Sequence, residues 1–125
     1  MTTLVTGGTG FVGRFVVEAL LREGRAVRVM ARTRPADGFF SRPVGFVQGN
    51  LDPDRDQSAA FEGVSAFVHA AFDHVPGRYR GGEGDDASGF RRRNLDGTVA
   101  LFEAAKRAGV ARLVFLSSRA VYGVQ

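Results

Sequence analysis

The chain of 125 residues is 44% hydrophobic, and its 17 basic and 13 acidic side chains give a net charge of +4. This composition is typical of one globular domain and excludes a disordered or low-complexity chain. The absence of cysteine excludes a disulfide scaffold and a thiolate metal site, and two histidines do not make a histidine-rich zinc site.

The same sequence indicates where the protein is found and which kinds of partner it binds. No apolar run approaches the roughly 20 residues that span a bilayer, so we expect no membrane insertion. The N-terminus has neither the basic start nor the apolar stretch of a secretory signal, so we expect a cytoplasmic protein. The basic residues are nearly all arginines spread from Arg14 to Arg119, which does not favour a nucleic-acid partner.

The first half of the chain predicts alternating strands and helices. A strand over residues 2–6 ends in glycines, and a helix over 11–23 follows, closed by Gly24. A second strand covers 26–31, a loop 32–43, a third strand 44–47, and a short helix 54–61. One apolar face of the first helix consists of Phe11, Val12, Phe15, Val16, Ala19 and Leu20.

The second half predicts a buried strand over residues 65–71, a glycine-rich loop over 73–89 and a fifth strand over 111–117. Between them a long helix over 89–108 ends at Gly109. Its inward residues are Leu95, Val99, Phe102 and Ala105. The alternation predicts an α/β fold in one domain over residues 1–125, a doubly wound parallel sheet of about five strands with helices on both faces. Such sheets bind ligands at the carboxyl ends of their strands.

Glycines follow the first strand with the spacing of a dinucleotide-binding loop. The segment over residues 6–13 reads Thr-Gly-Gly-Thr-Gly-Phe-Val-Gly. Gly7 allows the tight turn, Gly10 lets the backbone approach a pyrophosphate, and Gly13 lets the helix pack against the sheet. The helix start offers free N–H groups to the phosphates. The candidate cofactor-binding residues are Gly7, Thr9, Gly10, Phe11, Val12 and Gly13. The alternative is a glycine turn needed only for packing.

The end of the second strand bears on the choice between NAD and NADP. An acidic residue there would bind the ribose 2′-hydroxyl of NAD, but none occurs between Glu23 and Asp37. Arg32 stands just past the strand instead, and a guanidinium suits the 2′-phosphate of NADP. We therefore expect NADP as the cofactor in preference to NAD. The alternative for Arg32 is a solvated loop cation.

Five segments in order resemble motifs of the extended short-chain dehydrogenase/reductase family, whose members include NAD(P)-dependent epimerases and dehydratases. They are the glycine loop over 6–13, Val-Gln-Gly-Asn-Leu-Asp over 47–52, the run over 61–71, the helix segments over 94–98 and 103–105, and Leu-Ser-Ser-Arg-Ala-Val-Tyr-Gly over 116–123. The resemblance implies a Rossmann-like domain, truncated before the family's C-terminal lobe. It further implies the NAD(P)-binding portion of an epimerase, dehydratase or reductase that acts on a carbonyl or sugar-like substrate.

The resemblance also implies contacts with the cofactor. Asn50 and Leu51 would hold the adenine, with Asn50 standing where the family usually has Asp. Ala70 and Ala71 would lie along the dinucleotide because small residues let it approach the strand end. Phe72 would follow them at the sheet edge, and its alternative is a core or rim aromatic.

Three further residues would stand on the reacting side. By the resemblance, Asn94 and Ser117 would approach the nicotinamide, and Ser118 would be the catalytic hydroxyl that bonds the substrate. The alternative for Asn94 is a polar residue at a helix start, and for both serines a turn hydroxyl at a strand end. The arginines at 91–93 are either a solvated helix start or a lip that attracts a diphosphate-bearing substrate.

The chain departs from the family pattern in one respect. The family's proton donor is the tyrosine of a Tyr-x-x-x-Lys motif, and Tyr122 has no lysine four residues on. We therefore expect this portion to be inactive alone, which leaves open whether it acts as an enzyme. The alternative is a non-catalytic NADP-sensing module of similar fold. For a full-length protein the resemblance suggests a homodimer.

Overall fold

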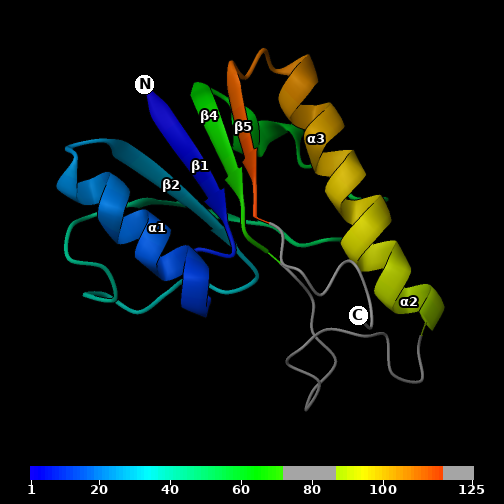
Figure 1. The fold of residues 1–125 in the computed structure, drawn as a ribbon, viewed down its shortest axis with the longest axis horizontal. Helices are drawn as coiled ribbons and strands as arrows, with labels where there is room; N and C mark the ends of the chain where they lie inside the picture. The colour runs from blue at the N-terminus through cyan, green and yellow to red at the C-terminus, as the bar shows by residue number, and fades with distance from the viewer. Residues whose placement is uncertain (72–86, 117–125) are drawn as a thin grey trace, which may run out of the picture.

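Five parallel strands form one sheet in the order β3-β2-β1-β4-β5 (Figure 1). The computed structural model describes residues 1–71 and 87–116. The strands are β1 (Thr2–Thr6), β2 (Ala26–Ala31), β3 (Gly45–Gln48), β4 (Val64–His69) and β5 (Arg112–Phe115). The chain builds outward from β1 to β3 and then crosses back to β4, so the strand order reverses beside β1. The predicted doubly wound parallel sheet is confirmed, with strand ends within two residues of those expected.

Helices cover both faces of the sheet, as Figure 1 shows for α1 and α3. Helix α1 (Phe11–Arg22) packs through Val17 and Leu21 on one face, together with Val5 and Val29 of the strands. The 3₁₀ helix η1 (Ser58–Phe61) and α3 (Gly97–Arg107) cover the other face. Adjacent residues of β1 therefore enter two different cores, because successive strand side chains point to opposite faces.

The buried face of α1 differs from the one predicted. Gly13, Val17 and Leu21 are buried, whereas Phe11 is 85% exposed and Phe15 is 65% exposed. The two phenylalanines contact each other edge to face, with 5.7 Å between ring centroids. The apolar stripe is wider than the contact with the sheet, and the side holding Gly13 is the one that can approach closest. The predicted face was therefore wrong for Phe11, Val12, Phe15 and Ala19, which are exposed, whereas Val16 and Leu20 are partly buried.

Of the predicted helix over 54–61, the second half forms the 3₁₀ helix η1, whereas residues 54–57 are not helical. Asp52 Oδ1 accepts the amide of Asp54, and Asp56 Oδ1 accepts the amide and hydroxyl of Ser58. These local bonds compete with the helical backbone pattern. Hydrogen bonds from the Ser58 hydroxyl, and then from its amide, hold the pKa of Asp56 below its ordinary value.

The predicted long helix over 89–108 is divided in the structure. Helix α2 (Ala87–Arg91) passes into a π-helical segment, η2 (Arg92–Asp96), before α3 begins. A π turn holds an additional residue, which rotates the residues before it relative to those after it. Leu95, within η2, is 47% exposed and Val99 is 45% exposed, both against expectation, while Leu101 and Ala105 are buried.

Strand β5 completes one edge of the sheet. It pairs with β4 in register from Ala66–Arg112 to His69–Phe115, and all four of its residues are exposed. Most of the predicted loop over 73–89 lies outside the described residues. Phe72, Ser117 and Ser118 also lie outside them. Among the described helices, none combines the length and apolarity needed to cross a bilayer.

Candidate functional site

A cleft of about 840 Å³ lies at the carboxyl ends of β1, β2 and β4. Residues that end or follow these strands line it, together with the start of α1 and part of η2. Its lining includes Gly7, Thr9, Gly10, Phe11, Val12, Gly13, Arg32, Asn50, Leu51, Ala70 and Ala71. The structure thus brings together eleven residues that the sequence predicted for one dinucleotide site. The cleft lies where the strand order reverses, the place where open parallel sheets bind ligands.

The glycine loop is held tightly against the end of β4. Gly7 has φ +68°, and a β-carbon there would lie 2.7 Å from the backbone of Ala70 and Ala71. The Gly10 amide donates to the Gly7 carbonyl oxygen at 2.9 Å and closes the turn. A β-carbon on Gly13 would lie 1.9 Å from the same oxygen. These contacts confirm the tight turn at Gly7. At Gly13 the close contact is with the loop itself and not, as predicted, with the sheet.

The start of α1 faces this cleft without a side-chain cap. Gly10 precedes the helix and has no side chain to bond its first amides. The first-turn residues Phe11, Val12 and Gly13 line the cleft. The first amides of a helix have no carbonyl partner within it, and they carry the positive end of the helix dipole. The arrangement can therefore receive an anionic group from the cleft.

The loop after β3 is fixed by a reciprocal pair of hydrogen bonds. Gln57 accepts the Asn50 amide at 2.9 Å through Oε1 and donates from Nε2 to the Asn50 carbonyl at 2.8 Å. The Asn50 side-chain oxygen accepts the Asp52 amide at 3.0 Å. A β-carbon on Gly49 would lie 2.6 Å from Met30 and Gln57. Asn50 and Leu51 are therefore presented to the cleft on a rigid turn.

Arginines line the rim of the cleft at Arg32, Arg92 and Arg93. Arg92 pairs with Asp54, and it also lies 3.8 Å from Asp52, which joins η2 to the loop after β3. Arg34 does not line the cleft, because its guanidinium lies 4.9 Å from the centre of the Phe46 ring. Arg32 is exposed and lines the cleft just past the end of β2.

A buried polar group lies directly beneath the cleft. His69, at the end of β4, bonds Thr6 Oγ1 through Nδ1 at 2.6 Å and Thr98 Oγ1 through Nε2 at 2.8 Å. Burial lowers the pKa of His69 to about 4. Sequence reasoning missed this group, although a His and two Thr within otherwise apolar elements were a signal to look for mutual contacts.

Some predicted residues are not placed in the cleft. Asn94 lies in η2 and is half-buried, but it is not among the lining residues. Phe72, Ser117 and Ser118 fall outside the described residues, so their roles stay predictions. The cleft also contains Thr6, Met30, Asp52 and Leu101, which the sequence did not single out.

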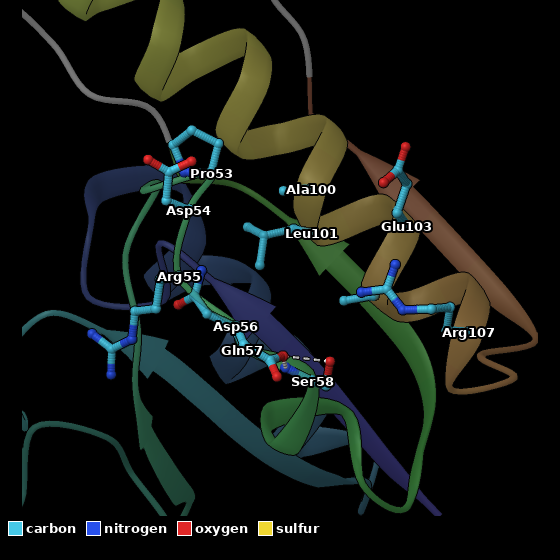
Figure 2. A pocket seen from close by; sticks show the side chains of 11 residues that line it. Pro53, Asp54, Arg55, Asp56, Gln57, Ser58, Ala100, Leu101, Glu103 and Arg107 are labelled. Carbon is cyan, nitrogen blue, oxygen red and sulfur yellow. Dashed lines mark hydrogen bonds between the residues drawn. The ribbon is translucent and has the colours of Figure 1, made fainter.

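A smaller cavity, of about 360 Å³, adjoins the cleft behind the loop after β3. Figure 2 shows residues 53–58 on one side of it and the α3 residues Leu101, Glu103 and Arg107 on the other. Pro53, Asp54 and Leu101 line both spaces. Within the described residues, no three His, Cys, Asp or Glu side chains gather as metal ligands would.

Comparisons with known proteins agree with this geometry. The model of the NAD dependent epimerase/dehydratase family matches residues 3–125. The chain is 35% identical to a putative dihydroflavonol 4-reductase of a Synechocystis species, over 97% of this chain and 34% of that protein. It spans about a third of the length of such relatives.

Solved structures show the same likeness. A short-chain dehydrogenase/reductase superfamily protein from Agrobacterium tumefaciens with bound NAD matches with a TM-score of 0.79 and 36% identity, over 98% of this chain and 34% of that one. A UDP-glucose-4-epimerase from Stenotrophomonas maltophila, with bound NAD and formylated UDP-arabinopyranose, matches with a TM-score of 0.78 and 29% identity. That match covers all of this chain and 39% of the epimerase.

Proposed function

The chain belongs to the NAD dependent epimerase/dehydratase family, and from this premise we propose that it binds NADP, in preference to NAD, for an epimerase, dehydratase or reductase. The observation that carries the proposal is the cleft at the carboxyl ends of the strands, with the glycine loop at its base. Family and fold together support a nicotinamide dinucleotide as its ligand. The finer choice of NADP rests on the charges of the rim.

The residues of the cleft suit the parts of such a cofactor. The glycine loop and the first amides of α1 would hold the pyrophosphate, because no side chain caps those amides. Asn50 and Leu51 would hold the adenine on the turn that Gln57 fixes. Ala70 and Ala71 would lie beside the dinucleotide, where their small side chains leave room. The bound cofactor would supply the hydride chemistry.

The preference for NADP rests on Arg32. This exposed arginine lines the cleft just past β2, where an acidic side chain would repel a 2′-phosphate. A guanidinium can donate two parallel hydrogen bonds to phosphate oxygens. Asp52 and Asp54 also line the cleft, but Arg92 pairs with Asp54 and lies near Asp52, so these two carboxylates have a local cation.

The reaction would be hydride transfer to or from a carbonyl or sugar-like substrate. The Ser118 hydroxyl would hydrogen-bond the substrate oxygen, and Asn94 and Ser117 would stand near the nicotinamide. Residues 1–125 contain no Tyr-x-x-x-Lys motif, so we expect them to bind cofactor without turning over substrate by themselves.

The test is a titration of the purified protein with NADPH and with NADH, in which the fluorescence of the cofactor reports binding. We expect NADPH to bind more tightly than NADH. Arg32→Ala should lower the affinity for NADPH by about 10- to 100-fold, the range of a lost hydrogen bond to a charged group. Binding of NADH should change little. Arg34→Ala is the matched control because Arg34 lies over Phe46, outside the cleft. Equal affinities for the two cofactors would overturn the NADP preference, and no binding of either would overturn the proposed function.

A further inference from the structure

His69 is fully buried at the carboxyl end of β4, an interior strand between β1 and β5. It stands in register with Thr6 of β1 on one side and Phe115 of β5 on the other. Its ring stacks on Phe115 at 5.8 Å between centroids and meets the edge of Phe102 at 5.8 Å. An imidazolium would be costly in these apolar surroundings, so the ring is neutral and has one N–H donor and one acceptor nitrogen.

Hydrogen-bond accounting decides which nitrogen carries the proton. The Ala71 amide donates to Thr6 Oγ1 at 3.3 Å, and the Ala70 amide is shared between Thr6 Oγ1 at 3.1 Å and the Thr6 carbonyl oxygen at 3.2 Å. A hydroxyl oxygen has two acceptor sites and one proton. With both acceptor sites directed at amides, the Thr6 hydroxyl donates its proton to Nδ1 of His69 at 2.6 Å. The proton of the ring is therefore on Nε2, which donates to Thr98 Oγ1 at 2.8 Å.

The first arm of this network reaches the glycine loop. Thr6 is the residue before Gly7, and Gly7 packs directly on the backbone of Ala70 and Ala71. The Thr6 hydroxyl thus joins the end of β1 to the end of β4 where both line the cleft. Its orientation depends on His69, because His69 is the acceptor of its proton.

The second arm reaches the opposite wall. Thr98 is buried at the start of α3, next to Gly97. A β-carbon on Gly97 would lie 2.0 Å from the carbonyl oxygen of Leu51, so α3 begins in contact with the loop after β3. Through Thr98, His69 anchors the helix against which that loop rests.

We propose that His69 is a positioning residue of the dinucleotide cleft, held as the neutral Nε2–H tautomer, which fixes the glycine loop through Thr6 and the Asn50–Leu51 side through Thr98. The proposal deepens the proposed function and rests on it for the identity of the ligand. The geometric part, that His69 orients Thr6 and thereby the Ala70 and Ala71 amides, does not depend on any ligand.

Nitrogen NMR of the histidine rings tests the tautomer. The chain has two histidines, so His74→Gln leaves the signals of His69 alone in the spectrum. We expect Nδ1 to be pyridine-like and Nε2 to be pyrrole-like at neutral pH. A proton on Nδ1, or on both nitrogens, would overturn the assignment.

Amide hydrogen exchange tests the positioning. His69→Phe keeps an aromatic ring in the stack but removes both hydrogen bonds. We expect the Ala70 and Ala71 amides to exchange about tenfold faster, while Val68 on the same strand changes less. Phe102→Leu, a loss of core packing, should speed exchange evenly along β4. An even change in His69→Phe would reduce His69 to a core residue and overturn the proposal.

Cofactor affinity tests the consequence for binding. We expect His69→Phe to lower the affinity for NADPH about tenfold, equivalent to about 1.4 kcal/mol. Thr6→Val should weaken NADPH binding similarly, whereas Thr6→Ser, which keeps the hydroxyl, should leave it unchanged. The double variant His69→Phe/Thr6→Val should bind NADPH no more weakly than either single variant. Ser65→Ala is the matched control, because Ser65 bonds Thr2 at the far end of β4.

The two levels of inference fail differently. If the unaltered protein binds neither NADPH nor NADH, the proposed function fails. The amide exchange of Ala70 and Ala71 then tests the positioning role of His69 without a ligand. If it binds NADPH and His69→Phe binds equally well, the positioning role fails while the proposed function stands.

Discussion

The position that a β-carbon would take on Gly97 lies 2.0 Å from the carbonyl oxygen of Leu51, far inside any permitted contact. Gly97 has helical backbone angles, with φ −63° and ψ −41°, which any residue adopts. Its identity is therefore explained by this contact between α3 and the loop after β3.

Gly97→Ala separates the two effects. Helix propensity alone favours alanine by about 1 kcal/mol, but the clash must displace either α3 or the Leu51 loop. We expect a net loss of about 1–3 kcal/mol in the free energy of unfolding, as for other overpacked sites, and weaker NADPH binding. Urea denaturation and a cofactor titration measure the two effects. Gly45→Ala is the control, since a β-carbon there would meet Arg28 at an ordinary 3.7 Å.

The Gln57 clamp on Asn50 gives a second prediction. In Gln57→Glu a carboxylate faces the Asn50 carbonyl oxygen that Nε2 now donates to. We expect a loss of about 1–3 kcal/mol in the free energy of unfolding, since the partly buried carbonyl loses its partner. NADPH binding should weaken too, because the adenine-side turn loosens. The exposed Gln48→Glu should cost much less, and a stability loss as large as that of Gln57→Glu would contradict this account.

A third prediction concerns acid stability. Burial lowers the pKa of His69 from 6.5 to about 4, so between these values the unfolded chain binds a proton that the folded protein does not. The free energy of unfolding should therefore fall as the pH drops from 6.5 to 4, by roughly 3 kcal/mol from this group. His69→Phe lacks that contribution. Chemical denaturation at several pH values should give a difference between the two proteins that is constant above pH 7 and changes below it.

The ion pair of Arg92 with Asp54 provides a contrast, because it should matter little for stability. The two side chains are 50% and 79% exposed, and such exposed pairs contribute about 0–1 kcal/mol. We expect Asp54→Asn to change the melting temperature by no more than a few degrees. A larger loss would show that the pair holds η2 in place.

The sequence predicts local features of this fold well. Five apolar runs separated by turn residues were sufficient for the parallel sheet, and the positive φ of Gly24 and Gly109 agrees with their assignment as helix ends. The glycine loop was also predictable, because its glycines follow the first strand at a characteristic spacing within one short segment. Its packing against Ala70 and Ala71 was not.

Features that depend on distant contacts were not predictable. The bonds of His69 join residues 63 and 29 positions away in the sequence, and only the strand register brings them together. Apolar side chains occupy more than one side of α1, so periodicity alone assigned Phe11 and Phe15 to the wrong face. The π turn before Gly97 likewise has no signature in hydrophobic spacing.

The central place of β1 in the sheet has a consequence for how the chain folds. One neighbour, β2, begins about twenty residues later and can pair with β1 early through a single crossover helix. The other neighbour, β4, pairs Thr2 with Val64, so a far longer loop must close before the middle of the sheet exists. Such distant pairings slow folding. We therefore expect the edge of β1 to stay unpaired, and open to pairing with other chains, until β4 pairs with it. The glycine loop that gives the cleft its base is therefore completed only in the second stage, when Ala70 and Ala71 meet Gly7.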